Sequence, residues 1–261
     1  PLPVIVIAEM LGIPPSERER FKEWSTIVAT ATELVPDPEE LVRRRDATEE
    51  MVEFLGSIVD KRAASPEDDL ISAIVSDEDP DGDKLTRDEV ISFAILLLVA
   101  GNETTTNLIG NGMLALLNYR DSLNALVADK SLIPAAMEET LRYDSPVQGL
   151  VRVVKQDVEL LGQSLPAGDV VMCMLGAANR DPARYTEPEI FDIQREETRH
   201  LSFGHGIHFC LGAPLARLEA SIAYDSLLTR FTDFSPVKGG LERGGTLLLR
   251  GADKLIITAS R

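Results

Sequence analysis

A cysteine in a glycine-rich segment is the residue whose surroundings are best suited to chemistry. Cys210 lies within FGHGIHFCLG, the sequence of residues 203–212, which contains three glycines. Glycine tolerates positive φ angles and lets a backbone lie close to a flat ligand. Pro214 follows at a place typical of a helix's first turn, so Cys210 precedes a helix N-terminus, where N–H groups and the helix dipole stabilise a thiolate. The segment therefore predicts a metal-binding thiolate, and the alternative is an inert cysteine in a turn.

Polar residues inside a long apolar helix form a second group. Residues 100–105 read AGNETT and follow the apolar run of a helix expected from the capping box at Thr86 to about Asn118. A mid-helix acid and hydroxyl are costly when buried unless they are hydrogen-bonded or used. Thr104 can donate to a carbonyl one turn earlier and open the helix locally, which makes a groove for dioxygen and water. We expect Thr104 to donate a hydrogen bond there and Glu103 to relay protons; a kink with a satisfied polar pair is the alternative.

These segments, in this order, resemble the cytochrome P-450 family. Phe203, Gly206, Cys210 and Gly212 match the family's haem-binding signature Phe-x-x-Gly-x-x-x-Cys-x-Gly, and residues 100–105 are similar to its (Ala/Gly)-Gly-x-(Asp/Glu)-Thr-Thr segment. The resemblance implies a haem-thiolate monooxygenase of the soluble bacterial or archaeal type, with haem b as cofactor and Cys210 as the iron ligand. The residues that it places around the cofactor are Ala100, Gly101, Thr104, Thr105, Arg152, Phe203, Gly204, His208, Cys210 and Gly212.

Two members of that set would contact the haem propionates. Arg152 ends the sequence PVQGLVR, a stretch that resembles the lining of the substrate pocket, and His208 lies two residues before Cys210. A lone arginine or histidine in a β-rich stretch has a surface role more often, so only the order of the motifs assigns these two.

A carboxylate and a guanidinium three residues apart form a third group. Glu139 and Arg142 lie on one face of an expected helix, and a pair of this kind is usually solvated and weak. Glu138 could also pair with Arg142 at a spacing of four. The pair resembles the family's Glu-x-x-Arg, which implies that Glu139 and Arg142 join a third residue, here Arg195, in a structural ion-pair set that supports the haem side of the core.

Helical periodicity dominates up to Pro146, and short β-rich runs follow, so we expect a mainly α fold with small β-sheets, of the cytochrome P-450 type. The β-rich runs are LVRVV, VELLG, DVVMCML, TLLLR and KLIITAS. The expected helices besides the one that begins at Thr86 are Val4 to Leu11, Ser16 to about Leu34, Pro38 to about Ala63, Asp69 to Val75, Tyr119 to Ala128, Ile133 to Tyr143 and about Pro214 to Phe231.

Composition limits the partners. The chain has 261 residues and a formal net charge of −17, which argues against nucleic acid and anionic membrane surfaces as partners. No apolar run is long enough to cross a membrane, and two distant cysteines, Cys173 and Cys210, favour a reducing cytoplasm. Since the sequence shows no flavin or nicotinamide fingerprint, electrons would come from a separate ferredoxin or flavodoxin-type donor. The expected reaction inserts one oxygen atom from O2 into a small apolar organic substrate.

The beginning of the chain departs from the family. Residues 1–15 read PLPVIVIAEMLGIPP, a segment that members carry after roughly a third of their length, including a helix that contacts the propionates. We therefore expect residues 1–261 to be the C-terminal two thirds of a single haem domain, without its N-terminal part. The alternatives are a peroxide-dependent peroxygenase, which an intact pair of Glu103 and Thr104 disfavours, and a haem-free helical fragment that acts as an interaction module.

Several other residues invite simpler interpretations. Residues 77–82 resemble the start of a calcium-binding loop, but Lys84 and Asp88 occupy places where a hydrophobic residue and a glutamate are expected, so an acidic loop is the better interpretation. Cys173 is expected to be a core thiol and Trp24 to pack a helix face. His200 and His205 have no convincing metal partners in the sequence.

Overall fold

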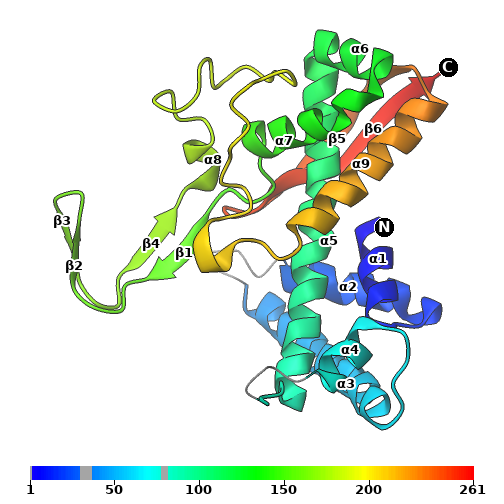
Figure 1. The fold of residues 1–261 in the computed structure, drawn as a ribbon, viewed down its shortest axis with the longest axis vertical. Coiled ribbons are helices and arrows are strands. Elements are labelled where there is room, and N and C mark those ends of the chain that lie inside the picture. Colours follow the sequence, from blue (N-terminus) through cyan, green and yellow to red (C-terminus); the bar gives the residue numbers. More distant parts are fainter. Residues whose placement is uncertain (1, 30–36, 78–81) are drawn as a thin grey trace. The chain divides into compact units, whose positions relative to one another are not determined.

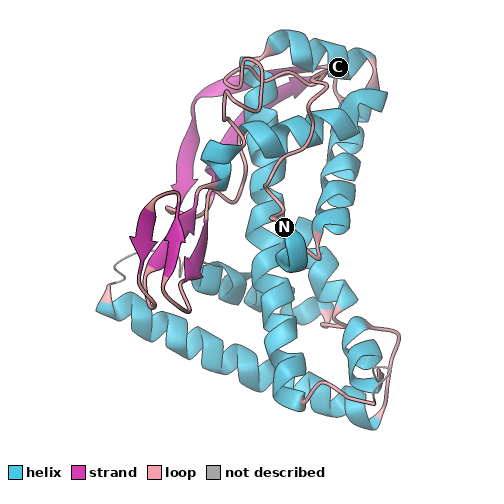
Figure 2. Ribbon diagram, turned by 60° about the vertical axis from the view of Figure 1, so that its left-hand side comes forward, coloured by secondary structure: helices cyan, strands magenta, loops and turns pink. Residues whose placement is uncertain are grey.

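The computed structural model describes residues 2–29, 37–77 and 82–261. The chain divides into two compact units, residues 1–106 and 107–261, and helix α5 (Arg87–Asn118) begins in the first and ends in the second (Figure 1). The described residues are mainly helical with three two-stranded sheets, as Figure 2 shows, which confirms the predicted fold class. Among the described helices, none is long and apolar enough to cross a membrane.

Two helices of the first unit begin at residues whose side chains cap them, α4 (Leu70–Ser76) at Asp69 and α5 at Thr86. The Asp69 carboxylate accepts a hydrogen bond from the Ser72 N–H at 2.7 Å and so satisfies a free donor of the helix that it precedes. Thr86 and Glu89 form the predicted capping box, with the Thr86 N–H donating to the carboxylate at 2.8 Å. Besides the first part of α5, the elements of this unit are α1 (Leu2–Met10), η1 (Pro15–Glu17), α2 (Arg18–Ala29), α3 (Pro38–Ala64) and α4 (Leu70–Ser76).

The core of the first unit lies between α2 and α3. Phe21, Met51 and Leu55 are fully buried. Trp24 is 3% exposed, and its ring centroid lies 5.4 Å from that of Phe54, so the prediction that Trp24 packs a helix face is confirmed. The predicted continuation of α2 to about Leu34 lies outside the described residues.

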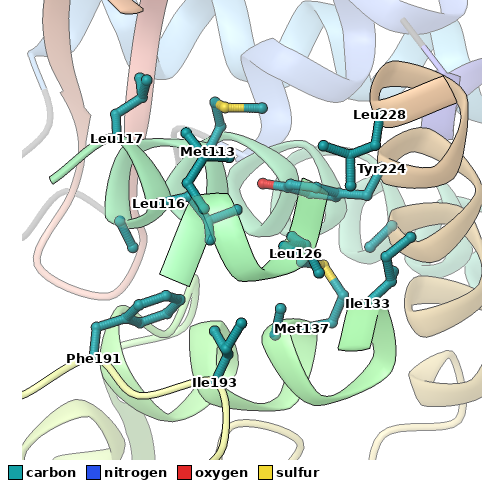
Figure 3. Close-up of a cluster of buried hydrophobic side chains, with 14 of the residues drawn as sticks. Met113, Leu116, Leu117, Leu126, Ile133, Met137, Phe191, Ile193, Tyr224 and Leu228 are labelled. Atoms are coloured by element: carbon teal, nitrogen blue, oxygen red, sulfur yellow. The ribbon is translucent and has the colours of Figure 1, made fainter. Parts of the chain in front are cut away.

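The second unit surrounds the C-terminal half of α5 with helices and strands. Figure 3 shows Tyr224 and Leu228 of α9 facing Met113 and Leu116 of α5, with Phe191 closing the cluster below them. The remaining elements are α6 (Arg120–Ala128), η3 (Lys130–Leu132), α7 (Ile133–Tyr143), β1 (Leu150–Val153), β2 (Val158–Leu160), β3 (Gln163–Leu165), β4 (Val170–Cys173), α8 (Leu175–Ala178), η4 (Gly206–His208), α9 (Ala213–Arg230), β5 (Asp233–Gly245) and β6 (Arg250–Ser260).

One glycine sets how closely α5, α7 and α9 approach one another. A Cβ atom at Gly112 would lie 2.7 Å from the Tyr224 hydroxyl and 3.0 Å from Thr140 Oγ1. Both distances are shorter than ordinary van der Waals contacts of a Cβ atom, so a side chain at this position would push the helices apart. Tyr224 is fully buried, and its hydroxyl donates to the Ile109 carbonyl at 2.8 Å. Burial raises the pKa of Tyr224 because the ionised ring would lose its hydration. The neutral phenol thus joins α9 to α5 at the centre of the unit.

The antiparallel sheets depart from the sequence prediction at two places. The run TLLLR, residues 246–250, is predicted to be β-rich, yet residues 246–248 form the connection between β5 and β6, while Leu249 makes an isolated β-bridge with Val147 and Arg250 begins β6. The partner of β6 is instead Asp233–Gly245, which contains Pro236 and several glycines and therefore lacks the composition of a strand. The pairing has register shifts after Pro236 and after Glu242. Long-range pairing with β6 has overridden local preference there.

Cys173 lies at the end of β4 and is exposed, so the prediction of a core thiol is wrong. Among the described strands, β4 pairs with β1 alone, with Cys173 opposite Leu150, and the resulting two-stranded sheet leaves most side chains of both strands accessible. An apolar run of this length predicts a strand but not which of its faces is covered.

Candidate functional site

The segment around Cys210 forms a closed loop held by its own backbone. The Cys210 N–H donates to the Phe203 carbonyl at 2.9 Å, and the Phe209 N–H donates to the Gly206 carbonyl at 3.0 Å. Gly204 and Gly206 have φ angles of +72° and +71°, a conformation that side chains disfavour. The glycines predicted to shape the loop therefore have a conformational reason to be there.

The loop delivers Cys210 to the beginning of α9. Gly212 is the N-terminal capping residue, Pro214 occupies the first turn, and the Ala213 N–H donates to the Cys210 carbonyl at 3.3 Å. Cys210 is partly exposed, and a Cβ atom at Gly212 would lie 3.9 Å from its sulfur. The thiol lies where a helix N-terminus favours negative charge, as an anionic metal ligand requires.

Large apolar side chains flank the cysteine and face outward. Ile207 is 98% exposed, Leu211 74% and Phe209 53%, and His208 in the same segment is also exposed. We call Ile207, Phe209 and Leu211 the apolar collar of the thiol. Exposed apolar side chains beside an accessible thiol suit a flat, mostly apolar ligand with a few charged substituents. The residues present therefore fit a haem bound through Cys210, with His208 available to a carboxylate at its edge.

Glu139, Arg142 and Arg195 lie together in the interior of the second unit. The Glu139 carboxylate accepts two bonds of 2.7 Å from Arg142 and one of 2.8 Å from the Asp192 N–H, and it lies 3.4 Å from Arg195 Nε. Arg142 is 1% exposed. Its three remaining donors reach the carbonyls of Asn179, Pro188 and Ile190.

Arg195 completes this set from the irregular segment after α8. Its guanidinium donates to the carbonyls of Thr186, Glu187 and Ile190 at 2.6 to 3.1 Å. The two arginines thus fasten the turn-rich segment after α8, which belongs to no strand, to helix α7. A buried charge pair is acceptable here because each charged atom has partners.

Glu138, the neighbour of Glu139, has different partners. Its carboxylate accepts bonds of 2.6 and 3.0 Å from Arg217 and lies 3.2 Å from His200 Nε2. The sequence analysis did not identify Arg217. No signal of local spacing could have done so, because the two residues are 79 positions apart.

Arg152 lies on β1, opposite Val171 of β4, and its side chain is exposed. Its Nη1 donates to the Val151 carbonyl at 2.9 Å. An exposed guanidinium on a short strand can pair with an anionic group, as the propionate prediction requires.

The segment predicted to handle oxygen belongs to the first unit. The Thr104 hydroxyl donates to the Ala100 carbonyl at 2.6 Å, the back-bond expected one turn earlier, and α5 continues without interruption through it. Thr105 is buried and Glu103 partly buried. Gly101 has a packing reason as well, since a Cβ atom there would lie 3.1 Å from Ile7 of α1.

The acidic segment that resembles a calcium loop falls largely outside the described residues, because residues 78–81 are not described. Among the residues that the structure does describe, there is no cluster of three or more histidine, cysteine or carboxylate side chains that could hold a metal ion.

Comparison with known proteins identifies the family. The cytochrome P450 family model matches residues 22–242. The chain is 45% identical over 236 residues to the cytochrome P450 monooxygenase PikC of Streptomyces venezuelae, covering 90% of this chain and 55% of the relative. It is 41% identical over 260 residues to 6-deoxyerythronolide B hydroxylase of Saccharopolyspora erythraea, covering 98% of this chain and 62% of the relative.

A solved structure agrees with this likeness. The corticosterone complex of CYP109E1 from Bacillus megaterium has 40% sequence identity and a TM-score of 0.91, covering 100% of this chain and 70% of that one. The chain thus spans little more than half the length of the curated relatives it matches, 55% and 62% of the two named above. A cysteine loop (residues 203–212) before a helix, a buried Glu-x-x-Arg pair and a family match over most of its residues lead to one conclusion: the chain belongs to the cytochrome P450 family, whose members bind haem iron.

Proposed function

We propose that this chain provides the thiolate side of a haem b monooxygenase that inserts one oxygen atom from O2 into an apolar organic substrate. The observation that carries the proposal is Cys210, a partly exposed thiol at the N-terminus of α9 within an apolar collar. Its sequence surroundings match the haem signature of the family to which the chain belongs. The protein would work in the cytoplasm, where its thiols stay reduced.

The haem, when bound, supplies the redox chemistry that activates dioxygen. In this proposal Cys210 is the axial ligand, and His208 and Arg152 hold the propionates by charge-assisted hydrogen bonds. Phe203, Gly204 and Gly212 shape the loop, and Ala100, Gly101 and Thr105 belong to the helix segment on the oxygen side. These assignments rest on family membership and, for Cys210, His208 and Arg152, also on the accessibility of their side chains.

Thr104 and Glu103 would manage protons on the oxygen side. The Thr104 hydroxyl donates to the Ala100 carbonyl, so this hydroxyl has to turn from that carbonyl before it can donate elsewhere. A hydroxyl with one backbone acceptor can alternate between two partners at modest cost, because one hydrogen bond replaces the other. Glu103 precedes it by one residue and would supply protons from solvent.

The proposed substrate is a small apolar organic molecule. The relatives of this chain include a 6-deoxyerythronolide B hydroxylase and a vitamin D(3) 25-hydroxylase, and solved relatives hold testosterone and corticosterone. These names support an apolar substrate class and do not distinguish among its members.

The proposed electron donor is a separate ferredoxin or flavodoxin-type protein. The whole chain carries a net charge of −17, yet cationic side chains gather beside the cysteine loop. The arginines Arg184 and Arg199 are exposed and line a hollow of about 830 Å³ that also touches Gly204 and Phe209. A local positive patch on an acidic protein favours an acidic partner at this face.

A spectrum of the full-length haem protein tests the proposal. Reduced under carbon monoxide, the wild type should show the red-shifted Soret band of a thiolate-ligated haem, and Cys210→Ser should lose it. Cys173→Ser is the matched control, since this second thiol is exposed at the end of β4 and should leave the band unchanged. A thiolate band that survives Cys210→Ser would reject the assignment.

Replacement of Thr104 tests the use of dioxygen. In Thr104→Ala, NADPH should be consumed with little product and more released peroxide, whereas Thr104→Ser should keep coupled turnover because it keeps the hydroxyl. Turnover that runs on added peroxide and does not change in Thr104→Ala would instead favour a peroxide-dependent peroxygenase.

A further inference from the structure

A second charged cluster lies beside the cysteine loop, centred on Glu138. The Arg217 fork from α9 holds the Glu138 carboxylate of α7 through both Nε, at 2.6 Å, and Nη2, at 3.0 Å. The Glu138 side chain is 24% exposed and that of Arg217 38%. The two-point geometry fixes the orientation of both groups, which a single contact would not do.

His200 approaches the same carboxylate from the segment before the loop. Its Nε2 lies 3.2 Å from Glu138 Oε2, while the Ser202 N–H donates to its Nδ1, also at 3.2 Å. With Nδ1 accepting from Ser202, Nε2 is the ring nitrogen that donates to Glu138. Burial alone would raise the pKa of Glu138, but the bonds from His200 and Arg217 and the charges of Arg217 and His200 lower it to about 2. The carboxylate is therefore ionised under all ordinary conditions.

Phe203 connects this cluster to the cysteine. The Arg217 guanidinium carbon lies 4.6 Å from the centroid of the Phe203 ring, and the His200 ring centroid lies 5.8 Å from it. The carbonyl of Phe203 accepts the backbone bond from Cys210 that closes the loop. The first residue of the loop is thus held between two side chains that share Glu138.

Arg217 and Cys210 also interact through charge. The hydrogen bond to Glu138 raises the pKa of Arg217 most; burial opposes this, and the charges of Glu138 and Cys210 raise it further. Because Arg217 lies over the ring of Phe203, whose carbonyl accepts the Cys210 N–H, its positive charge lies beside the cysteine loop. The Glu138 carboxylate, in two-point contact with Arg217, opposes that charge. Loss of either partner changes the net charge beside the sulfur by one unit, with opposite signs in the two cases.

We propose that Glu138 is a positioning residue that, through Arg217, sets the charge beside the Cys210 thiolate and thereby the reduction potential of the iron that it binds. The inference rests on the proposed function, because it requires Cys210 to be the iron ligand. The step concerned is the transfer of one electron from the donor protein to ferric iron, which gives ferrous iron with no proton transferred. Nearby positive charge favours the product of that step, since the added electron increases the negative charge of the iron–thiolate unit.

The test is a spectroelectrochemical titration of the full-length haem protein and its variants. Glu138→Gln keeps an acceptor for His200 but leaves Arg217 uncompensated, so the midpoint potential should shift positive. Arg217→Gln should shift it negative, Arg217→Lys should stay near the wild type, and the double variant Glu138→Gln/Arg217→Gln should return toward it. Asp225→Asn is the matched control, because the Asp225 pair with Lys130 at 2.8 Å also starts on α9 but lies two turns further from the loop.

Opposite signs in the two single variants are the decisive result. If the pair had only a structural role, the midpoint potential would shift in the same direction in Glu138→Gln and Arg217→Gln. Shifts of equal sign, or no shift in either variant, overturn the inference. If Arg217→Gln does not retain haem, Glu138→Gln is compared with the wild type and with Arg217→Lys, which keeps the charge, and the absence of a positive shift in Glu138→Gln overturns the inference.

The carbon monoxide spectrum separates the two proposals. Variants that keep the thiolate-type band with unshifted potentials reject the role of Glu138 and leave the role of Cys210 standing. A wild-type protein without that band rejects both.

Discussion

Glu138 and Glu139 are adjacent on α7, yet their surroundings have little in common. Glu139 is 4% exposed and faces inward to Arg142 and Arg195, which fasten the irregular segment after α8. Glu138 is 24% exposed and faces α9 and the cysteine loop. Two carboxylates one residue apart on a helix point about 100° apart, so a single helix can serve a structural network and a functional one.

Burial decides what each carboxylate contributes. Arg142 is 1% exposed, so its charge depends wholly on Glu139 and on three carbonyls. Arg217 keeps contact with water, which replaces part of any bond that it loses. The inner pair therefore chiefly stabilises the fold, and the outer pair can change in charge without loss of the fold.

Replacement of Glu139 by glutamine should have the largest effect. It leaves the buried Arg142 charge without a counter-charge, and we expect the free energy of unfolding to fall by about 3–5 kcal/mol. The measurement is denaturant unfolding of the full-length haem protein. Glu138→Gln is the adjacent control, with an expected loss of about 1–2 kcal/mol because solvent and His200 still reach the group. Equal losses in the two variants would remove the distinction between them.

Gly112→Ala should have the next largest effect, because it forces α5 away from α9 and from α7, the helix that carries both carboxylates. The new Cβ atom would press on the Tyr224 hydroxyl and on Thr140, and overpacking of this kind costs about 1–3 kcal/mol. Gly110→Ala, on the same helix, meets no atom within 4 Å and should be neutral or stabilising by up to about 1 kcal/mol. Thermal unfolding of the two variants measures the contrast, and a destabilised Gly110→Ala would show that helix geometry rather than packing is responsible.

The dependence of stability on pH should report on Glu138. Its pKa is lowered from 4.5 to about 2, so its contribution to stability is fully present above pH 4.5 and is lost as the pH falls toward 2. The stability difference between the wild type and Glu138→Gln should therefore be constant from pH 7 to 5 and shrink below 4.5. Unfolding curves at several pH values measure it, and a difference that persists at pH 2 would contradict the assigned contacts.

Local sequence signals predicted the helices and the loop, and long-range contacts account for what they missed. The bounds of α7, Ile133 to Tyr143, agree with the prediction because an apolar face and Pro134 near its start define it locally. Strand β5 was missed because its sequence lacks strand character and only pairing with β6 makes it a strand. The spacing of three residues, together with the resemblance to the family's Glu-x-x-Arg, predicted the pair of Glu139 and Arg142, whereas the pairing of Glu138 with Arg217 depends on how α7 packs against α9.

Asp225→Asn should have the smallest effect on the free energy of unfolding, and it provides the reference against which the loss in Glu138→Gln is measured. Asp225 and Lys130 are 58% and 42% exposed, and an exposed pair of this kind contributes about 0.2–1 kcal/mol, less at high salt. The Glu138–Arg217 pair also involves a residue of α9, but it is more buried and has a two-point geometry. Its loss should therefore exceed that of Asp225→Asn and depend less on salt. Unfolding at low and at high ionic strength compares the two. If both variants lose the same small, salt-sensitive amount, solvent screens the Glu138 pair as fully as the exposed one, and its charge cannot act on the cysteine loop.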